Sequence, residues 1–203
     1  MKIIGVGRNY ADHIKELNNE VPNDPVIFFK PETSIIIRNQ PFFYPSFSSD
    51  IHYEVEIVVK ICKNGKNIEE EFATKYYDQI GIGIDFTARD LQTKAKEKGL
   101  PWTLAKGFNG SAPISGFLPL SNFKDVQDIN FHLELDDKEV QKGNTGLMIY
   151  KVDYLIAYIS QFIMLKKGDL IFTGTPKGVG PVEIGNNLKA YIEGEKLLDF
   201  NVR

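Results

Sequence analysis

Three acidic residues have the types and the spacing to hold a metal ion. Glu54 and Glu56 lie two residues apart in a stretch, 51–62, whose apolar residues alternate, so both carboxylates would share one face of a strand. Asp85 ends the apolar run IGIGI, where a buried carboxylate without a partner would be costly. Carboxylate oxygens suit a hard cation such as Mg²⁺ or Mn²⁺. The Glu-x-Glu pair by itself is more typical of a solvated strand face, so both interpretations remain open on the pattern alone.

A histidine and a carboxylate form a second group with possible chemistry. His13 and Glu16 are three residues apart in a stretch expected to be helical, so their side chains would be neighbours on one helix face. A carboxylate beside a histidine can hold the tautomer of the ring and raise its basicity, which favours a general base for water. An ordinary surface pair has the same spacing.

Cationic and polar side chains form a third group. Arg89 and Gln92 follow Asp85 at spacings of four and three, which predicts that one helix face carries all three. Arg89 could bind a carboxylate with two hydrogen bonds, and Lys106 in LAKGFNG offers a further cation. The run GTPKGVG lacks the residue order of a phosphate-binding loop, and it indicates a tight turn that exposes backbone amides and the Thr175 hydroxyl. Solvent exposure is the alternative for each of these residues.

Short strands and a few helices must position these groups. Strands are predicted at 2–6, 26–30, 34–38, 51–62, 80–84 and 170–173, in a hairpin over 128–142 that turns at Asp136-Asp137, and twice in the tail. Helices are predicted at 9–18, 69–78, 86–98 and the second part of 148–165. Asn64-Gly65 predicts another hairpin turn. Because strands outnumber helices and rarely alternate with them, the sequence predicts an α+β fold with a mainly antiparallel core.

Composition limits the classes of function. The chain has 203 residues, which fits one domain, and 42% of them are hydrophobic, enough for a sizeable core. Its 24 basic and 27 acidic residues give a net charge of −3, which argues against nucleic acid as the partner. No apolar run approaches about 18 residues, so we expect no membrane span. The single cysteine, Cys62, excludes an internal disulfide, and with no leader pattern at the start we expect a cytoplasmic protein.

Six motifs in order along the chain resemble the fumarylacetoacetate hydrolase family. The resemblance extends from about residue 3 to the end of the chain and is strongest to the short branch that contains acylpyruvate hydrolases and oxaloacetate decarboxylases. The motifs are GRNYADH, VIFFKPET, HYEVEI, IGIDFTARDLQ, GLPWTLAKGFNGSAPISGF and LIFTGTPKGVGPV.

The resemblance implies roles for the groups described above. It implies an α+β fold in one domain, 1–203, built as a β-rich roll of mixed sheets. Proteins of this family are usually homodimers. It assigns Mg²⁺ or Mn²⁺ to Glu54, Glu56 and Asp85, and it places the catalytic pair His13 and Glu16 on a lid segment, 9–25, that orders over the site. Lys106 is implied as a further catalytic residue. Substrate contacts are implied for Arg89, Gln92, Thr175 and Lys30.

We therefore expect metal-dependent cleavage of a carbon–carbon bond in small 2-oxo acids, by acylpyruvate hydrolysis, oxaloacetate decarboxylation or both. One alternative is an isomerase or decarboxylase of longer oxo-diacids from aromatic degradation, with the same metal centre. Another is a catalytically silent, metal-stabilised module, although such a module has no chemical need for the His13–Glu16 pair.

Overall fold

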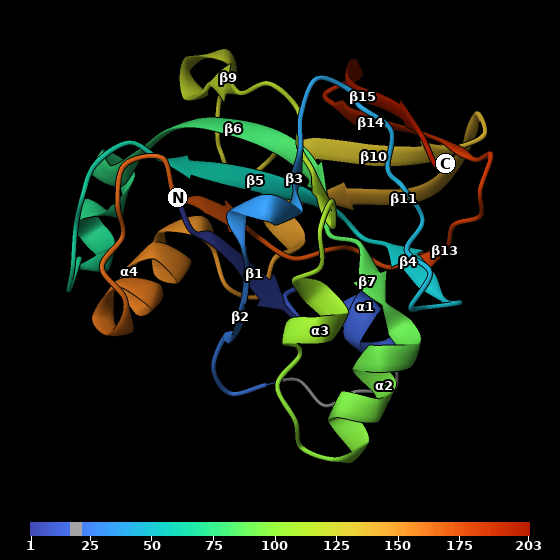
Figure 1. Cartoon of the computed structure of the whole chain (residues 1–203). Coiled ribbons are helices and arrows are strands. Elements are labelled where there is room, and N and C mark those ends of the chain that lie inside the picture. The colour runs from blue at the N-terminus through green and yellow to red at the C-terminus, as the bar shows by residue number, and fades with distance from the viewer. Residues whose placement is uncertain (17–21) are drawn as a thin grey trace.

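A six-stranded mixed sheet forms the centre of the computed structural model, which describes residues 1–16 and 22–203 (Figure 1). The strand order is β2-β1-β12-β5-β6-β9, and only β1 and β12 run parallel. The strands are β1 (Ile3–Gly7), β2 (Val26–Lys30), β5 (Val55–Ile61), β6 (Tyr77–Ile84), β9 (Leu118–Pro119) and β12 (Leu170–Phe172).

A second, four-stranded antiparallel sheet packs beside the first, in the order β11-β10-β14-β15 (Figure 1). It consists of two hairpins, β10 (Asn130–Leu135) with β11 (Lys138–Asn144) and β14 (Asn187–Ile192) with β15 (Glu195–Asn201). Two smaller sheets complete the fold, made of β13 (Gly180–Pro181), β4 (Ile51–Tyr53) and β7 (Thr87–Ala88), and of β3 (Ile35–Ile36) and β8 (Ala112–Pro113). The α+β prediction and the roll of mixed sheets are confirmed.

One hydrophobic cluster joins the two large sheets. It includes Ile57 and Ile82 from the central sheet and Leu133 and Ala190 from the other, all with no exposed surface. Helix α4 (Val152–Phe162) contributes Leu155 and Ile156 to the same cluster. Burial of this apolar surface is the main free energy that holds the sheets together.

The remaining helices lie at one end of the central sheet. They are α1 (Ala11–Glu16), α2 (Arg89–Glu97) and α3 (Thr103–Lys106), and Figure 1 shows them grouped below the strands β1 and β7. None of the helices in the described part of the chain is long and apolar enough to cross a membrane. Of the predicted lid segment 9–25, residues 17–21 lie outside the described residues.

Several predicted elements differ from the structure. The strand predicted at 51–62 is broken at Glu54 into β4 and β5, which belong to different sheets. The Asn64-Gly65 hairpin is wrong, because Gly65 pairs with Leu165 rather than closing a turn. The helix predicted at 69–78 is a 3₁₀ helix at Glu70–Tyr76, and β6 then begins at Tyr77. The hairpin turn at Asp136-Asp137 is confirmed, with both residues in the left-handed region at φ 49° and 61°.

Candidate metal centre and active site

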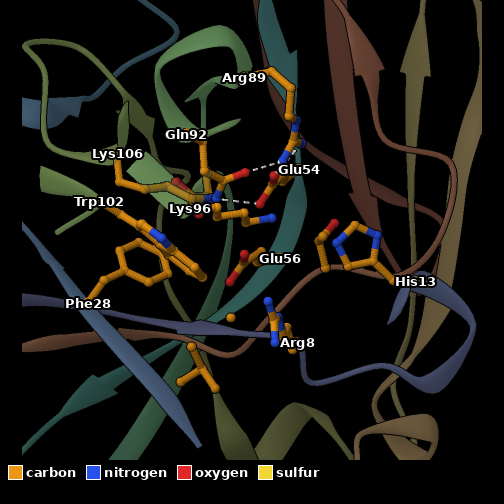
Figure 2. A pocket seen from close by; sticks show the side chains of 14 residues that line it. Arg8, His13, Phe28, Glu54, Glu56, Arg89, Gln92, Lys96, Trp102 and Lys106 are labelled. Carbon is orange, nitrogen blue, oxygen red and sulfur yellow. Dashed lines mark hydrogen bonds and ion pairs between the residues drawn. The ribbon is translucent and has the colours of Figure 1, made fainter. Parts of the chain in front are cut away.

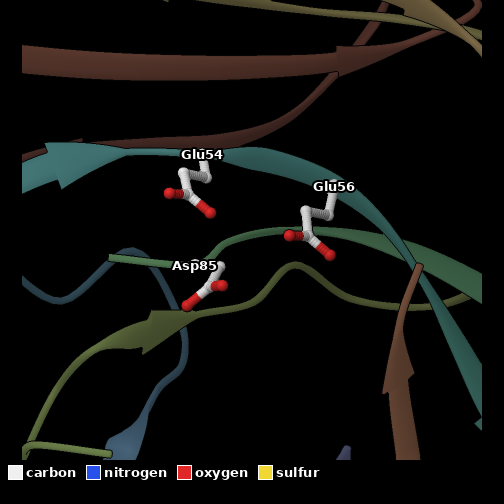
Figure 3. A group of neighbouring side chains, drawn as sticks. All are labelled: Glu54, Glu56 and Asp85. Atoms are coloured by element: carbon white, nitrogen blue, oxygen red, sulfur yellow. The ribbon is translucent and has the colours of Figure 1, made fainter. Parts of the chain in front are cut away.

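Strand pairing brings the three acidic residues together. Strands β5 and β6 are antiparallel with Val55 opposite Ile84, and the Asp85 amide donates to the Glu54 carbonyl at 2.8 Å. This register places the Asp85 side chain beside Glu54, although the two residues are far apart in the sequence. A carboxylate oxygen from each of Glu54, Glu56 and Asp85 lies within 4.8 Å of the others, as Figure 3 shows. All three residues are buried, with 5%, 1% and 1% of their surface exposed.

The chemistry of this donor set fits a hard divalent cation. Burial, followed by repulsion from Asp85 and Glu54, raises the pKa of Glu56 well above its usual range. Glu56 is held toward the others because its Oε2 accepts a hydrogen bond from the Gly174 amide at 2.7 Å. Three carboxylates forced together in a buried space need positive charge, and oxygen ligands select magnesium or manganese over softer ions.

Lys106 supplies part of that positive charge. Its Nζ lies 2.8 Å from Glu54 Oε2, 2.6 Å from Asp85 Oδ2 and 2.6 Å from Thr87 Oγ1. Burial opposes the charged ammonium, but Asp85 and Glu54 outweigh this effect and raise the pKa of Lys106. Burial likewise opposes the charged Glu54 carboxylate, but Lys106 and Arg89 hold its pKa well below the usual range. The predicted catalytic lysine is therefore in direct contact with two of the three carboxylates.

Helix α2 carries the predicted Arg89 and Gln92 to the same cavity. Arg89 donates to Glu54 Oε1 at 2.6 Å and to the Gln92 side-chain oxygen at 2.7 Å. Because that oxygen accepts from Arg89, the Gln92 amide nitrogen is the atom that can donate to a ligand. The prediction that Asp85 shares a helix face with them is wrong, because α2 begins at Arg89 and Asp85 follows a strand.

His13 and Glu16 meet on α1 as their spacing predicted. His13 Nδ1 lies 3.1 Å from Glu16 Oε2, and the same carboxylate accepts from the Gly178 amide at 2.9 Å. Glu16 thus joins α1 to the loop GTPKGVG. His13 is 6% exposed and lines the cavity. Figure 2 shows its ring on the side of the cavity opposite Trp102.

Thr175 lines the cavity and is held there by Gln141, a residue that was not predicted. Gln141 Nε2 donates to Thr175 Oγ1 at 2.9 Å, and Gln141 Oε1 accepts from the Val55 amide at 2.9 Å. Because the Thr175 oxygen already accepts one bond, its hydroxyl proton can be donated to a ligand. The hairpin that carries Gln141 was predicted, but its packing against the loop was not.

Lys30 is placed differently from the prediction. It is 3% exposed, and it is not among the described residues that line the cavity. Its ammonium lies 2.6 Å from Asp85 Oδ1 and donates to the backbone carbonyls of Phe86, Lys106 and Ser111. Burial lowers its pKa to about 8, although the Asp85 charge acts in the opposite direction. Lys30 therefore supports Asp85 from behind instead of contacting a substrate, because an ammonium enclosed by carbonyls has no donor left for one.

The cavity has further walls that were not predicted. Phe28 and Trp102 lie on one side, while Arg8 and Lys96 reach into it from the end of β1 and from α2 (Figure 2). About 30 Å³ is open to water-sized groups, which is space for about two waters. Lys96 could have been found from the sequence, because it continues the face of Arg89 and Gln92 by one more turn.

Known proteins resemble this chain over almost its whole length. The family model described as fumarylacetoacetate hydrolase C-terminal matches residues 2–201. A mitochondrial oxaloacetate decarboxylase of Dictyostelium discoideum is 46% identical over 194 residues, which are 95% of this chain and 89% of the relative. A mitochondrial oxaloacetate tautomerase, FAHD1 of Mus musculus, is 42% identical over 201 residues, 99% of this chain and 91% of the relative. The crystal structure of fumarylpyruvate hydrolase from Pseudomonas aeruginosa with Mn²⁺ and pyruvate superimposes with a TM-score of 0.94 at 35% identity, and covers 100% of this chain and 89% of that one.

Proposed function

This chain belongs to the fumarylacetoacetate hydrolase family, and on that premise we propose that it is a divalent-metal-dependent enzyme that cleaves a carbon–carbon bond in small 2-oxo acids. Its reactions would be acylpyruvate hydrolysis, oxaloacetate decarboxylation or both. The observation that carries the proposal is the meeting of three buried carboxylates in one cavity. The names of the relatives support the substrate class, since they specify oxaloacetate and fumarylpyruvate.

We propose Mg²⁺ or Mn²⁺ as the ion and Glu54, Glu56 and Asp85 as its ligands. When bound, such an ion supplies Lewis-acid stabilisation of the negative charge that develops on a substrate oxygen as the bond breaks. Three carboxylate ligands leave coordination positions for substrate oxygens and water. Mn²⁺ is the ion in the structure of the Pseudomonas aeruginosa enzyme, which supports a divalent ion of this kind.

The other cavity residues bind and orient the substrate in this proposal. Lys106 and Arg89 offset its negative charge. The Thr175 hydroxyl, oriented by Gln141, donates to a substrate carboxylate oxygen, and the Gln92 amide nitrogen can donate to a second one.

His13 moves the proton in the hydrolytic reaction. Its Nδ1 faces Glu16, so a proton held on Nδ1 leaves Nε2 free to accept one from water. The hydroxide adds to the distal carbonyl carbon, the carbon–carbon bond breaks, and the pyruvate carbon takes up a proton. In decarboxylation CO₂ leaves without attack by water, and the pyruvate enolate that remains takes up a proton from solvent, so His13 has no corresponding step in that reaction.

Tautomerisation of oxaloacetate is the second candidate. The relative named as an oxaloacetate tautomerase favours it, and His13, which lines the cavity, can take a proton from the carbon next to a ketone and return it to the oxygen. This reaction consumes nothing and releases nothing. Interconversion of enol and keto oxaloacetate without pyruvate release would distinguish it.

Mg²⁺-dependent release of pyruvate tests the proposal. Purified protein is supplied with acetylpyruvate or oxaloacetate, with and without Mg²⁺, while the enol absorbance is followed in parallel. We expect pyruvate from at least one substrate and only with the metal. Absence of both pyruvate release and tautomerisation would favour the longer oxo-diacids or the silent module instead.

The homodimer and the cytoplasmic location stay predictions. Exposed apolar side chains support a dimer, among them Phe43 at 69%, Phe47 at 52% and Leu104 at 77% exposure. Measurement of the molar mass in solution tests it. The free thiol of Cys62 is compatible with a reducing compartment, and microscopy of the tagged protein tests the location.

A further inference from the structure

Asn9 is a fully buried polar residue on the segment between β1 and α1. Its side-chain nitrogen donates to the Thr173 carbonyl at 2.7 Å and to the Tyr150 carbonyl at 3.0 Å, and its side-chain oxygen accepts from the Tyr150 amide at 2.7 Å. Two carbonyls face the nitrogen and an N–H faces the oxygen, so these partners match the amide group of an asparagine. A buried polar group with its partners matched in this way fixes the segments that it joins.

The Thr173 carbonyl that Asn9 holds belongs to the same peptide unit as the Gly174 amide. This peptide bond is trans and therefore planar, so its carbonyl and its N–H point in opposite directions and turn together. Asn9 binds the carbonyl end of the unit at 2.7 Å, and the N–H end donates to Glu56 Oε2, also at 2.7 Å. The position of a proposed metal ligand thus depends, through one rigid plane, on a side chain from a distant segment.

The backbone around this peptide unit makes the support necessary. The Thr173 amide and hydroxyl both donate to the Ile57 carbonyl, which fixes Thr173 against β5. Gly174 has a φ of +100°, and a glycine offers little resistance to rotation of the peptide unit before it. Such a rotation would turn the Thr173 carbonyl toward Glu56, where two acceptor oxygens would repel each other. The bond from Asn9 opposes this rotation.

Asn9 also fixes the start of the segment that carries His13. Its own carbonyl accepts from the Ile149 amide at 2.9 Å. The next residue, Tyr10, forms an antiparallel bridge with Met148, and α1 follows directly. Asn9 therefore connects the base of α1 to the support of the metal site.

We infer that Asn9 is a positioning residue for the metal centre. It orients the Thr173–Gly174 peptide unit, whose amide holds Glu56 in place to bind the cation. The inference rests on the metal site of the proposed function, and Asn9 has no part in the bond cleavage itself. Loss of a group that positions a metal ligand typically weakens metal binding by about 10–100-fold.

Isothermal titration of the full-length protein with Mn²⁺, without substrate, tests this role. In Asn9→Ala we expect Mn²⁺ to bind at least tenfold more weakly than in the unmodified protein, because Glu56 loses its oriented donor. Asn9→Asp keeps the size of the side chain and the acceptor for the Tyr150 amide, but it replaces the donor to Thr173 by an acceptor. The same weakening is expected, and this second variant gives the measurement if Asn9→Ala does not fold.

Ser160→Ala is the matched control. Ser160 is also fully buried, and its hydroxyl oxygen accepts from the Ile68 amide at 2.8 Å. This variant and Asn9→Ala therefore each leave one backbone amide without its side-chain acceptor, and both should lower the melting temperature. Ser160→Ala should nevertheless keep the Mn²⁺ affinity within twofold of the unmodified protein.

A crystal structure of the Asn9 variant gives a readout that loss of stability alone would not change. We expect the Thr173 carbonyl to have rotated from its present direction and the Gly174 amide to lie beyond hydrogen-bond distance of Glu56. An unchanged peptide unit that still binds Glu56 would overturn the inference. A weakening of Mn²⁺ binding no greater than that in Ser160→Ala would also overturn it.

The proposed function fails separately from this inference. A protein whose Mn²⁺ affinity depends on Asn9, but which neither releases pyruvate nor tautomerises oxaloacetate, leaves the role of Asn9 standing and rejects the reactions. An unmodified protein that binds no Mn²⁺ would overturn the metal centre and the role of Asn9 together.

Discussion

Lys106 and a divalent cation compete for the same carboxylates. The ammonium contacts Glu54 and Asp85 at 2.8 and 2.6 Å, so an ion bound there would repel it. We predict that Lys106→Met lowers turnover about 10²-fold or more, because a donor to the developing charge is lost, but that Mn²⁺ binds at least as tightly as before. Calorimetric titration with Mn²⁺ measures the second effect. Weaker Mn²⁺ binding in this variant would mean that Lys106 helps to build the metal site.

A substitution of His13 should affect acylpyruvate hydrolysis and oxaloacetate decarboxylation differently. The ring is held 3.1 Å from Glu16, and of the two bond-cleaving reactions only hydrolysis gives it a proton-transfer step. We predict that His13→Ala reduces acylpyruvate hydrolysis by about 10²-fold or more and changes oxaloacetate decarboxylation by less than about threefold. Rates of pyruvate release from the two substrates give the answer. Equal loss of both reactions would contradict the division of roles.

At the scale of elements, the loop GTPKGVG holds α1 over the cavity. The Gly178 amide donates to Glu16, and the φ of Gly178 is +95°, where a Cβ would clash with the Val140 carbonyl oxygen. We predict that Gly178→Ala destabilises the protein by about 1–3 kcal/mol and reduces hydrolysis more than decarboxylation, because Glu16 loses its anchor and His13 its orientation. Thermal melts and the rates of the two reactions measure these effects.

Gly185→Ala is the matched control for that variant. Gly185 also has a positive φ, +102°, but nothing lies within 4 Å of the position that a Cβ would occupy, so only the backbone cost remains. It should lower the melting temperature less and leave the ratio of the two activities unchanged. If both alanine variants had the same ratio of activities, the loop would have no part in positioning α1.

The carboxylates beside the break between β4 and β5 could be predicted only in part. Period-two alternation correctly placed Glu54 and Glu56 on one face, and the strand before Asp85 was also predicted. Their burial was not predictable from the alternation, because the polar face of this strand is covered by α3 and the GTPKGVG loop, which are distant in sequence. The placement of Lys30 was not predictable for the same reason. The family resemblance implied that it contacts the substrate, but the packing of distant segments encloses its ammonium behind Asp85.

At the scale of the whole molecule, the hairpins and the mixed-sheet class were predictable because local turns and alternation determine them. Asp136-Asp137 is an example, since its residue types favour the left-handed turn that the structure contains. The parallel pairing of β1 with β12 joins Ile3 to Leu170, and no local pattern encodes a contact between residues so distant in the sequence.

The stability of the whole molecule should depend on pH through Glu56 unless metal is present. Its folded pKa is raised above the usual 4.5, so the neutral form stabilises the fold at low pH and that contribution is lost as the pH rises from about 4.5 through the folded pKa. We predict that the metal-free protein loses melting temperature as the pH rises above about 5, and that saturating Mg²⁺ raises the melting temperature most at the alkaline end, because binding needs the deprotonated carboxylate. Thermal melts across this range measure both trends. A Mg²⁺ stabilisation that is greatest at the acidic end would contradict this account.

The most direct measurement of the central claim is an anomalous difference map from a crystal of the protein grown with Mn²⁺ and recorded at the manganese absorption edge. We predict one strong peak per chain, at about 2.0–2.2 Å from an oxygen of each of Glu54, Glu56 and Asp85. A protein that turns over substrate with Mn²⁺, yet binds the ion elsewhere and keeps Lys106 alone between Glu54 and Asp85, would contradict it.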